Sequence, residues 1–121
     1  MTTTVLIVDD HETFRSFARA LLESEGFEVI GEAEDGISGV RSVQSLEPDL
    51  IVLDVQLPDL SGFEVLQRLR AEGVPTPVVL TSSRDASSYG DQVDASGAVG
   101  FIPKAELSGQ AIRSLLKEAG G

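Results

Sequence analysis

The chain has 121 residues, enough for one domain with its own hydrophobic core. It contains no cysteine, which excludes disulfides, thiolate metal sites and cysteine nucleophiles and favours a reducing, cytoplasmic location. A net charge of −11 makes direct binding of nucleic acid by this domain unexpected, because phosphate backbones repel an acidic surface. The sequence has no apolar run long enough to span a membrane, so no membrane association is expected.

Short apolar runs predict five strands. Four runs are almost continuously apolar and rich in β-branched residues, as strands covered on both faces should be: residues 5–8, 50–53, 78–80 and 99–102. Residues 27–33 alternate between apolar and polar side chains instead. This alternation predicts a half-exposed strand at an edge of the sheet.

Helical periodicity fills the gaps between these runs. Three apolar stripes have helical spacing: Phe14, Phe17, Ala18, Leu21 and Leu22; Ile37, Val40, Val43 and Leu46; and Ala111, Ile112, Leu115 and Leu116. Ser61 and Glu64 have the spacing of a capping box that opens a further helix. Residues 85–95 form the weakest predicted helix, because the segment is rich in serine and carries Gly90 at its middle.

A strand followed by a helix, repeated five times, is typical of the α/β class. The pattern predicts a doubly wound five-stranded parallel sheet with helices on both faces, in the order 2-1-3-4-5 of flavodoxin-like folds. The sequence has no linker or internal repeat, so residues 1–121 are interpreted as one domain.

Polar residues follow four of the five predicted strands. Asp9 and Asp10 follow the first strand and Asp54 ends the third, while Thr81 and Lys104 close the fourth and fifth. In open parallel sheets, ligands bind beyond the carboxyl ends of the strands, so these side chains are expected to meet. Three close carboxylates would favour a bound Mg²⁺, and a hydroxyl and an ammonium would complement a phosphoryl group. His11, beside the acidic pair, is expected to be an exposed residue of the first helical turn.

These residues also carry a family resemblance. The segments Val8-Asp9-Asp10, Asp54 to Gly62, Val78 to Ser82 and Gly100 to Lys104 resemble the signatures of response-regulator receiver domains, of the CheY-like kind. Asp9-Asp10-His11 followed by Phe14-Arg15 further resembles the subclass that usually precedes a helix-turn-helix DNA-binding domain. The resemblance implies a two-component signalling domain and not an enzyme.

The resemblance implies a role for each residue at the site. Asp54 would be the phosphoacceptor, Asp10 a direct Mg²⁺ ligand and Asp9 a ligand through water. The backbone carbonyl of Gln56 would be the third protein contact to the metal.

Three further positions take roles in phosphoryl binding and switching. Thr81 would be the switch hydroxyl, and Ser82 and Lys104 would join it in binding the phosphoryl group. Phe101 would be the aromatic residue that swings inward on activation, altering the surface of the fourth helix, fifth strand and fifth helix.

The resemblance also implies partners. The phosphoryl donor would be a sensor histidine kinase or a phosphotransfer protein, and phosphorylation would allow a homodimer to form. Since the printed sequence ends at Gly121, it is interpreted as a regulator cut to its first domain, with a stand-alone receiver as the alternative.

Two positions depart from the commonest receiver pattern. Proline precedes Lys104, at Pro103, whereas in many receivers it follows the lysine, so the loop is expected to differ. Gln56 places an amide near the phosphoryl group, which leaves the hydrolysis rate open.

Four alternative functions fit the sequence less well than a phosphorylated receiver. A haloacid-dehalogenase-like Mg²⁺-dependent phosphatase would need a second acid two residues after the nucleophile, where this chain has Gln56. A flavin site does not suit the acidic loop after the first strand, and the chain has no P-loop motif. The main rival is a receiver-like interaction module that works without phosphorylation.

Overall fold

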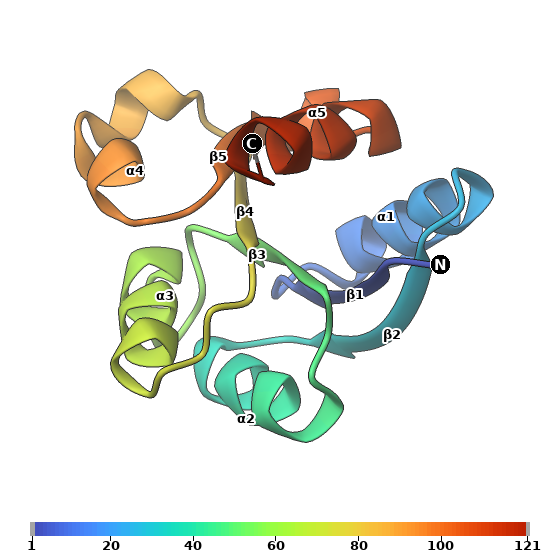
Figure 1. The fold of residues 1–121 in the computed structure, drawn as a ribbon. Coiled ribbons are helices and arrows are strands. Elements are labelled where there is room, and N and C mark those ends of the chain that lie inside the picture. Colours follow the sequence, from blue (N-terminus) through green and yellow to red (C-terminus); the bar gives the residue numbers. More distant parts are fainter. Residues whose placement is uncertain (1, 121) are drawn as a thin grey trace.

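The computed structural model describes residues 2–120. Its strands are Thr4–Val8 (β1), Glu28–Ala33 (β2), Leu50–Asp54 (β3), Val78–Ser82 (β4) and Gly100–Pro103 (β5). Its α-helices are Glu12–Ser24 (α1), Gly36–Leu46 (α2), Gly62–Ala71 (α3), Gln92–Ala95 (α4) and Gly109–Gly120 (α5). Two short 3-10 helices, Ala86–Tyr89 (η1) and Lys104–Glu106 (η2), complete the described elements (Figure 1). Within residues 2–120, no helix has both the length and the apolar character needed to cross a membrane.

The five strands form one sheet in the order β2-β1-β3-β4-β5, and each neighbouring pair is parallel. This confirms the predicted fold class and strand order. After β2 the chain returns past β1 to form β3, so the order in which strands are added reverses between β1 and β3. Because these two central strands are parallel, their carboxyl ends lie at the same edge of the sheet.

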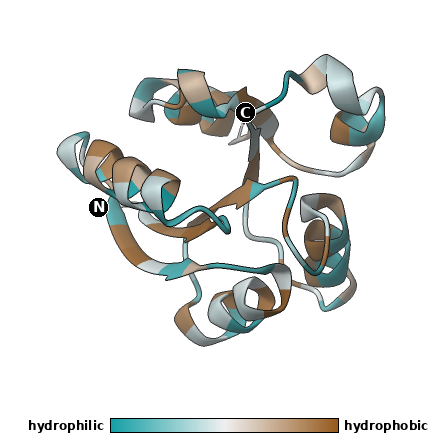
Figure 2. Ribbon diagram, turned by 180° about the vertical axis from the view of Figure 1, so that it is seen from behind, coloured by the Kyte–Doolittle hydropathy of each residue, from teal (hydrophilic) through white to brown (hydrophobic). Residues whose placement is uncertain are grey.

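Helices cover the sheet on both sides, and the core is therefore divided in two. On one face, Ala18 and Leu22 of α1 and Ile112 of α5 pack against Val5 and Ile7 of β1. The other face carries α2 and α3. Successive side chains of a strand point to opposite faces, so a strand buried on both must be apolar throughout. Figure 2 shows this as brown strands between helices of mixed colour.

The connection from β3 to α3 is tight, and it fixes the end of β3. The predicted capping box is present: the Ser61 hydroxyl accepts from the Glu64 N–H, and the Glu64 carboxylate accepts from the Ser61 N–H. Gly62 lies directly against the end of β3, where a Cβ would approach the Asp54 carbonyl oxygen to 2.5 Å. A larger residue would therefore push Asp54 out of place.

Two of the predicted apolar stripes are wider than the buried faces of their helices. Phe17 of α1 is 55% exposed, whereas Ala18 and Leu22 of the same stripe are fully buried. Ile37 and Leu46, at the two ends of α2, are 44% and 42% exposed. These three side chains therefore lie outside the faces of α1 and α2 that pack against the sheet, although the helical spacing groups them with the buried residues.

The segment predicted as the weakest helix is not one helix. It divides into η1 and the four-residue α4, and Gly90 between them has a φ of +58°. A φ in this range is strained for residues other than glycine, so the backbone turns at Gly90. Both pieces lack a fully buried residue.

Candidate functional site at the carboxyl ends of the strands

The predicted residues meet at the carboxyl edge of the sheet. Asp9 and Asp10 follow β1, Asp54 is the last residue of β3 and Lys104 is the first residue of η2. In the strand register, Asp54 pairs with Thr81 of β4, so both side chains point to the same face.

The carboxylate of Asp54 is buried, with only 3% of the residue exposed. Its Oδ1 accepts the backbone N–H of Gln56 at 3.2 Å, and its Oδ2 lies 3.4 Å from Lys104 Nζ. Burial, and then the charge of Asp9, raise the pKa of Asp54 to about 6, while Lys104 and the Gln56 N–H oppose the shift. The carboxyl group is therefore mostly ionised at neutral pH, although its site disfavours the charge.

Lys104 is held closest to Asp9. Its Nζ lies 2.6 Å from Asp9 Oδ2, an ion pair at short range although its angles are not those of a hydrogen bond. Asp9 is completely buried, and its other oxygen, Oδ1, accepts the backbone N–H of His11 at 2.8 Å. Lys104 also lies over the ring of Phe14, 4.6 Å from its centroid. The ammonium group is thus enclosed between two acids and an aromatic ring.

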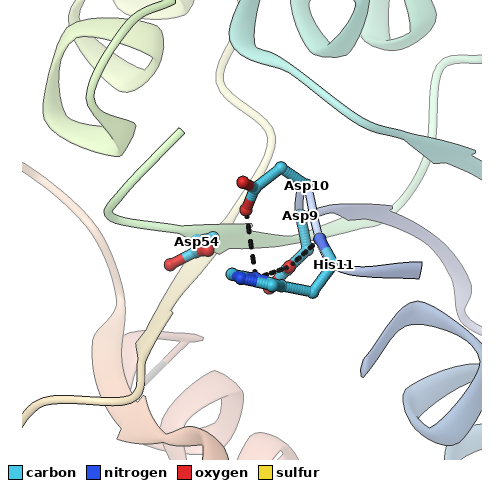
Figure 3. Close-up of side chains that lie close together, drawn as sticks. All are labelled: Asp9, Asp10, His11 and Asp54. Carbon is cyan, nitrogen blue, oxygen red and sulfur yellow. Dashed lines mark hydrogen bonds and ion pairs between the residues drawn. The ribbon is translucent and has the colours of Figure 1, made fainter. Parts of the chain in front are cut away.

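Asp10 and His11 form the exposed side of the same cluster. His11 Nδ1 lies 3.1 Å from Asp10 Oδ1 and 3.2 Å from Asp9 Oδ1, and Figure 3 shows the imidazole joined to both carboxylates. His11 is exposed as expected, but it is the N-cap residue of α1 and not part of the first turn. Ligand atoms of Asp9, Asp10, His11 and Asp54 all lie within 4.8 Å of one another.

The hydroxyl of Thr81 is buried beside this cluster and has no hydrogen-bond partner within residues 2–120. A buried hydroxyl without a partner costs free energy, typically about 1–3 kcal/mol. Together, the oxygens of the three aspartates, the Lys104 ammonium and this free hydroxyl are complementary to a divalent cation and a tetrahedral oxyanion.

Ser82 does not join the cluster through its hydroxyl. Its Oγ lies 2.6 Å from the Tyr89 hydroxyl and accepts the Arg84 N–H at 3.0 Å. Alternation along β4 sends this side chain to the face opposite Thr81. The Ser82 hydroxyl is thus directed to Tyr89 and Arg84 in this structure, and a part for Ser82 in phosphoryl binding stays a prediction.

Phe101, the expected switch aromatic, lies on the same face as Ser82. Its ring is 5.9 Å from that of Tyr89, which in turn contacts the Phe63 ring of α3 edge-on at 5.8 Å. In the register of the sheet, Phe101 pairs with Leu80 and not with Thr81. Side-chain contacts connect Ser82, the neighbour of Thr81, to Phe101 through Tyr89. The sequence did not predict this role for Tyr89, because the residue lies in the weakest predicted helix.

Arg15 is a second residue whose position the sequence left without a role. Its Nη1 donates to the Asp9 carbonyl at 2.6 Å, and its Nε donates to Glu32 of β2 at 3.1 Å. Burial alone would raise the pKa of Glu32, but hydrogen bonds from Arg19 and Arg15 outweigh it and lower that pKa. This network fixes the backbone at Asp9. The motif that includes Arg15 does not predict these contacts, because only the fold brings α1 against the end of β2.

Comparisons with known proteins identify relatives of this chain. Residues 5–117 match the family model described as the response regulator receiver domain. The chain is 43% identical to the virulence-factor transcription regulator BvgA of Bordetella pertussis over 102 residues, covering 84% of this chain and 49% of BvgA. It is 33% identical over 101 residues to the DNA-binding transcriptional activator EvgA of Escherichia coli, covering 84% and 50% of the two chains. The chain thus spans about half the length of these curated relatives.

A solved structure matches over almost the whole chain. The signal receiver domain of the response regulator NarL from Mycobacterium tuberculosis superimposes with a TM-score of 0.85 at 32% identity, covering 99% of this chain and 98% of that one. The family model covers most of the sequence, and the structural match reproduces the fold. This chain therefore belongs to the family of response regulator receiver domains.

Proposed function

We propose that residues 1–121 form a single phosphoryl-accepting receiver domain in which Asp54 is the phosphorylated residue. The observation that carries this proposal is the setting of the Asp54 carboxylate. It is buried, faces the Lys104 ammonium at 3.4 Å and lies beside the unbonded Thr81 hydroxyl. Burial disfavours the negative charge of the Asp54 carboxylate itself. Lys104 and Thr81 are placed to stabilise negative charge on a phosphoryl group bonded to it.

The donor is a phosphohistidine on a sensor histidine kinase or a phosphotransfer protein. An oxygen of ionised Asp54 forms the new bond to phosphorus, the bond from phosphorus to the donor nitrogen breaks, and that nitrogen keeps the electron pair. Transfer of this kind needs positioning and charge neutralisation more than covalent chemistry from the protein. A carboxyl group with a pKa near 6 is available as the ionised nucleophile at neutral pH.

The residues present suit a Mg²⁺ ion. Asp10 and Asp54 would hold it directly, Asp9 through water, and Gln56 through its backbone carbonyl. Hard oxygen donors of this kind are the ligands that Mg²⁺ prefers, and the repulsion among three close carboxylates gives a reason to bind a cation. When bound, the ion neutralises charge on the transferred group.

Thr81 and Lys104 are the residues that contact the phosphoryl oxygens in this proposal. The Thr81 hydroxyl is free to donate, and the Lys104 ammonium already faces Asp54. A hydrogen bond from Thr81 to the phosphoryl group would give the unpaired hydroxyl a partner. Because this bond would form only in the phosphorylated state, it would favour the conformation of that state. Thr81 is therefore the switch residue.

Phosphorylation then alters the surface formed by α4, β5 and α5. The segment 85–95 is held mainly by the Tyr89 ring and its hydroxyl bond to Ser82, the residue after Thr81. Phe101 packs against the same ring. A movement of Thr81 would displace the adjacent Ser82 and, through its hydrogen bond, Tyr89. Segments with few buried contacts are the ones that move in switching.

The output is the control of transcription through a DNA-binding domain in the same protein. The support is that BvgA and EvgA are named as transcription regulators and that each is about twice the length matched here. The protein would act in the cytoplasm, and phosphorylation would favour a homodimer.

Incubation with acetyl phosphate tests the proposal directly. With Mg²⁺, intact mass should rise by one phosphoryl group that is lost in acid, and chelation with EDTA should abolish the gain. Asp54→Asn should not be labelled, whereas the control Asp94→Asn, which alters an exposed acid of α4, should be labelled like the parent. Equal labelling of Asp54→Asn would contradict the assignment.

The same measurement separates this function from its main rival. A receiver-like module that works without phosphorylation would take up no phosphoryl group under any of these conditions. A Mg²⁺-dependent phosphatase would turn over acetyl phosphate continuously without a lasting gain in mass.

A further inference from the structure

The imidazole of His11 lies where a metal ligand would lie. Its Nδ1 is 3.1 Å from Asp10 Oδ1 and 3.2 Å from Asp9 Oδ1. Two ligands at about 2.1 Å from a metal and at right angles to each other are about 3 Å apart. His11 Nδ1 is thus spaced from each carboxylate oxygen as one metal ligand is from its neighbour, and Figure 3 shows the ring between the two carboxylates.

The backbone holds these atoms in place without help from an ion. The His11 N–H donates to Asp9 Oδ1 at 2.8 Å, and Arg15 holds the Asp9 carbonyl at 2.6 Å. Lys104 is paired with the other oxygen of Asp9, Oδ2, which leaves Oδ1 on the His11 side. The imidazole itself is 65% exposed, so it can adjust to an ion at little cost in packing.

A second observation points to a ligand at this place. The buried hydroxyl of Thr81 has no partner within residues 2–120 and lies on the same face of the sheet as Asp54. Asp54 in turn completes the group of four ligating residues that contains His11. A buried hydroxyl without a partner in the described residues therefore lies on the face of the sheet that carries this cluster.

We propose that His11 is a further ligand of this cation site, through Nδ1, and that it raises the affinity of the site for Mn²⁺, Co²⁺ or Zn²⁺ relative to Mg²⁺. Imidazole nitrogen suits these borderline metals, whereas Mg²⁺ takes oxygen ligands and keeps several waters. The inference rests on the proposed cation site of the receiver. It assigns to His11 a selective effect: the side chain raises the affinity for transition metals relative to the affinity for Mg²⁺.

The competing explanation is that His11 only hydrogen-bonds to the two carboxylates. In that case its removal would leave transition-metal affinity unchanged or raise it, because the carboxylate oxygens would be free for the ion. Ligation predicts the opposite sign. The two explanations therefore differ in an affinity that can be measured without any phosphoryl transfer.

The chain has one histidine, so imidazole nitrogen NMR reports on this site alone. Adding Zn²⁺ to the parent should shift the Nδ1 resonance of His11 strongly, while Mg²⁺ at saturation should leave it nearly unchanged. In parallel, calorimetric titrations with Zn²⁺ and Mn²⁺ should give affinities at least about tenfold weaker for His11→Ala than for the parent, since even residues that only support a ligand contribute this much.

Two controls make the result specific. Glu12→Gln removes an exposed carboxylate beside the cluster and should bind every metal like the parent. In His11→Ala the ratio of Zn²⁺ affinity to Mg²⁺ affinity should fall at least about tenfold, a comparison that holds whether or not Mg²⁺ binding itself changes. The fold of this variant is expected to be intact, because the His11 side chain makes no capping hydrogen bond to residues of α1 in the described chain.

An unshifted Nδ1 resonance in Zn²⁺, or equal Zn²⁺ affinity for His11→Ala and the parent, would overturn the inference. Normal Mg²⁺-dependent labelling in the same samples would show that the proposed function stands without it. Absence of labelling in the parent, with a clear Zn²⁺ shift at His11, would instead reject the function and leave the metal ligand in place.

Discussion

The ammonium group of Lys104 lies 2.6 Å from Oδ2 of Asp9 and 3.4 Å from Oδ2 of Asp54. Without a bound cation or phosphoryl group, its nearer partner is therefore Asp9, the completely buried acid. Lys104 has two functions in this arrangement. It stabilises Asp9 in the resting domain, and it faces the residue that would be phosphorylated.

The first function predicts a large loss of stability on removing the charge. Lys104→Met should lower the metal-free free energy of unfolding by about 2–4 kcal/mol, because buried Asp9 loses its counter-ion. Urea unfolding measures the change. The control Lys117→Met replaces the chain's other lysine, which is exposed on α5, and should change stability by less than about 0.5 kcal/mol. Equal stability of the two variants would show that the contact between Lys104 and Asp9 contributes little.

The raised pKa of Asp54 predicts how stability varies with pH. Folding raises this pKa from 3.8 to about 6, so the folded state binds a proton more tightly than the unfolded chain. The contribution of Asp54 to stability therefore falls as pH rises through this window, and the full penalty is present above about pH 7. Asp54→Asn removes the penalty.

Metal-free Asp54→Asn should consequently be more stable than the parent at neutral pH, by on the order of 1–3 kcal/mol. The advantage should shrink as pH is lowered from about 7.5 to about 5, and urea unfolding of both proteins in EDTA at several pH values measures it. A constant advantage at every pH would mean that titration of Asp54 is not its cause. Saturating Mg²⁺ should stabilise the parent more than the variant, because the ion binds the folded site.

The unbonded hydroxyl of Thr81 predicts opposite effects on stability and on switching. Thr81→Val keeps the shape of the side chain and removes the unpaired group, so the metal-free domain should become more stable by about 1 kcal/mol. Labelling by acetyl phosphate should remain substantial, because Asp54 and Lys104 are unchanged. Thr13→Val, on the exposed side of α1, is the matched control and should alter neither property.

The switching response of the same variant can be measured by amide hydrogen exchange. Beryllofluoride, a mimic of the phosphoryl group, should change protection in the parent mainly within residues 82–104, and this change should be largely absent in Thr81→Val. Parent changes confined to Asp9, Asp10 and Asp54 would mean that binding stays local, and an unaltered response in Thr81→Val would remove Thr81 from the switch.

The bond between Tyr89 and Ser82 predicts where the weakest segment is held. Tyr89→Phe keeps the ring contacts with Phe63 and Phe101 but loses this bond, so it should cost about 0.5–1.5 kcal/mol. Exchange should accelerate in residues 86–95 and remain unchanged in α1. Ser82→Ala also loses the bond from the Arg84 N–H, and the double variant should be less destabilised than the sum of the two. Full additivity would indicate that the two hydroxyls do not interact.

The elements with strong local signals were predicted correctly. Val5 to Val8 and Leu50 to Leu53 have apolar side chains on both sides of the strand, a pattern that only a doubly covered strand satisfies. The Ser61 capping box defined the start of α3, because its two hydrogen bonds are made within four residues. Signals of this kind depend on neighbours in the chain, so the sequence contains them completely.

Errors arose where the outcome depends on a distant neighbour. Phe17 fits the apolar stripe of α1, yet it is 55% exposed, and its ring lies 6.4 Å from that of Phe14 on the same helix. Gly90 was recognised as a weak point, but the break of residues 85–95 into η1 and α4 also reflects how little packs beneath them. Ser82 and Thr81 are adjacent hydroxyls in sequence, and strand alternation sends them to opposite faces.

The sequence by itself determined the class of fold, the order of the strands and the list of residues at their carboxyl ends. These follow from periodicity and from the rules of parallel sheets, both of which are local or topological. Only the tertiary structure decided the pairing of Lys104 with Asp9, the link from Ser82 to Tyr89, the Arg15 contact with the Asp9 carbonyl and the place of His11 between two carboxylates. Each of these depends on distances of a few ångströms between side chains of separate elements or tight turns, and packing alone sets such distances.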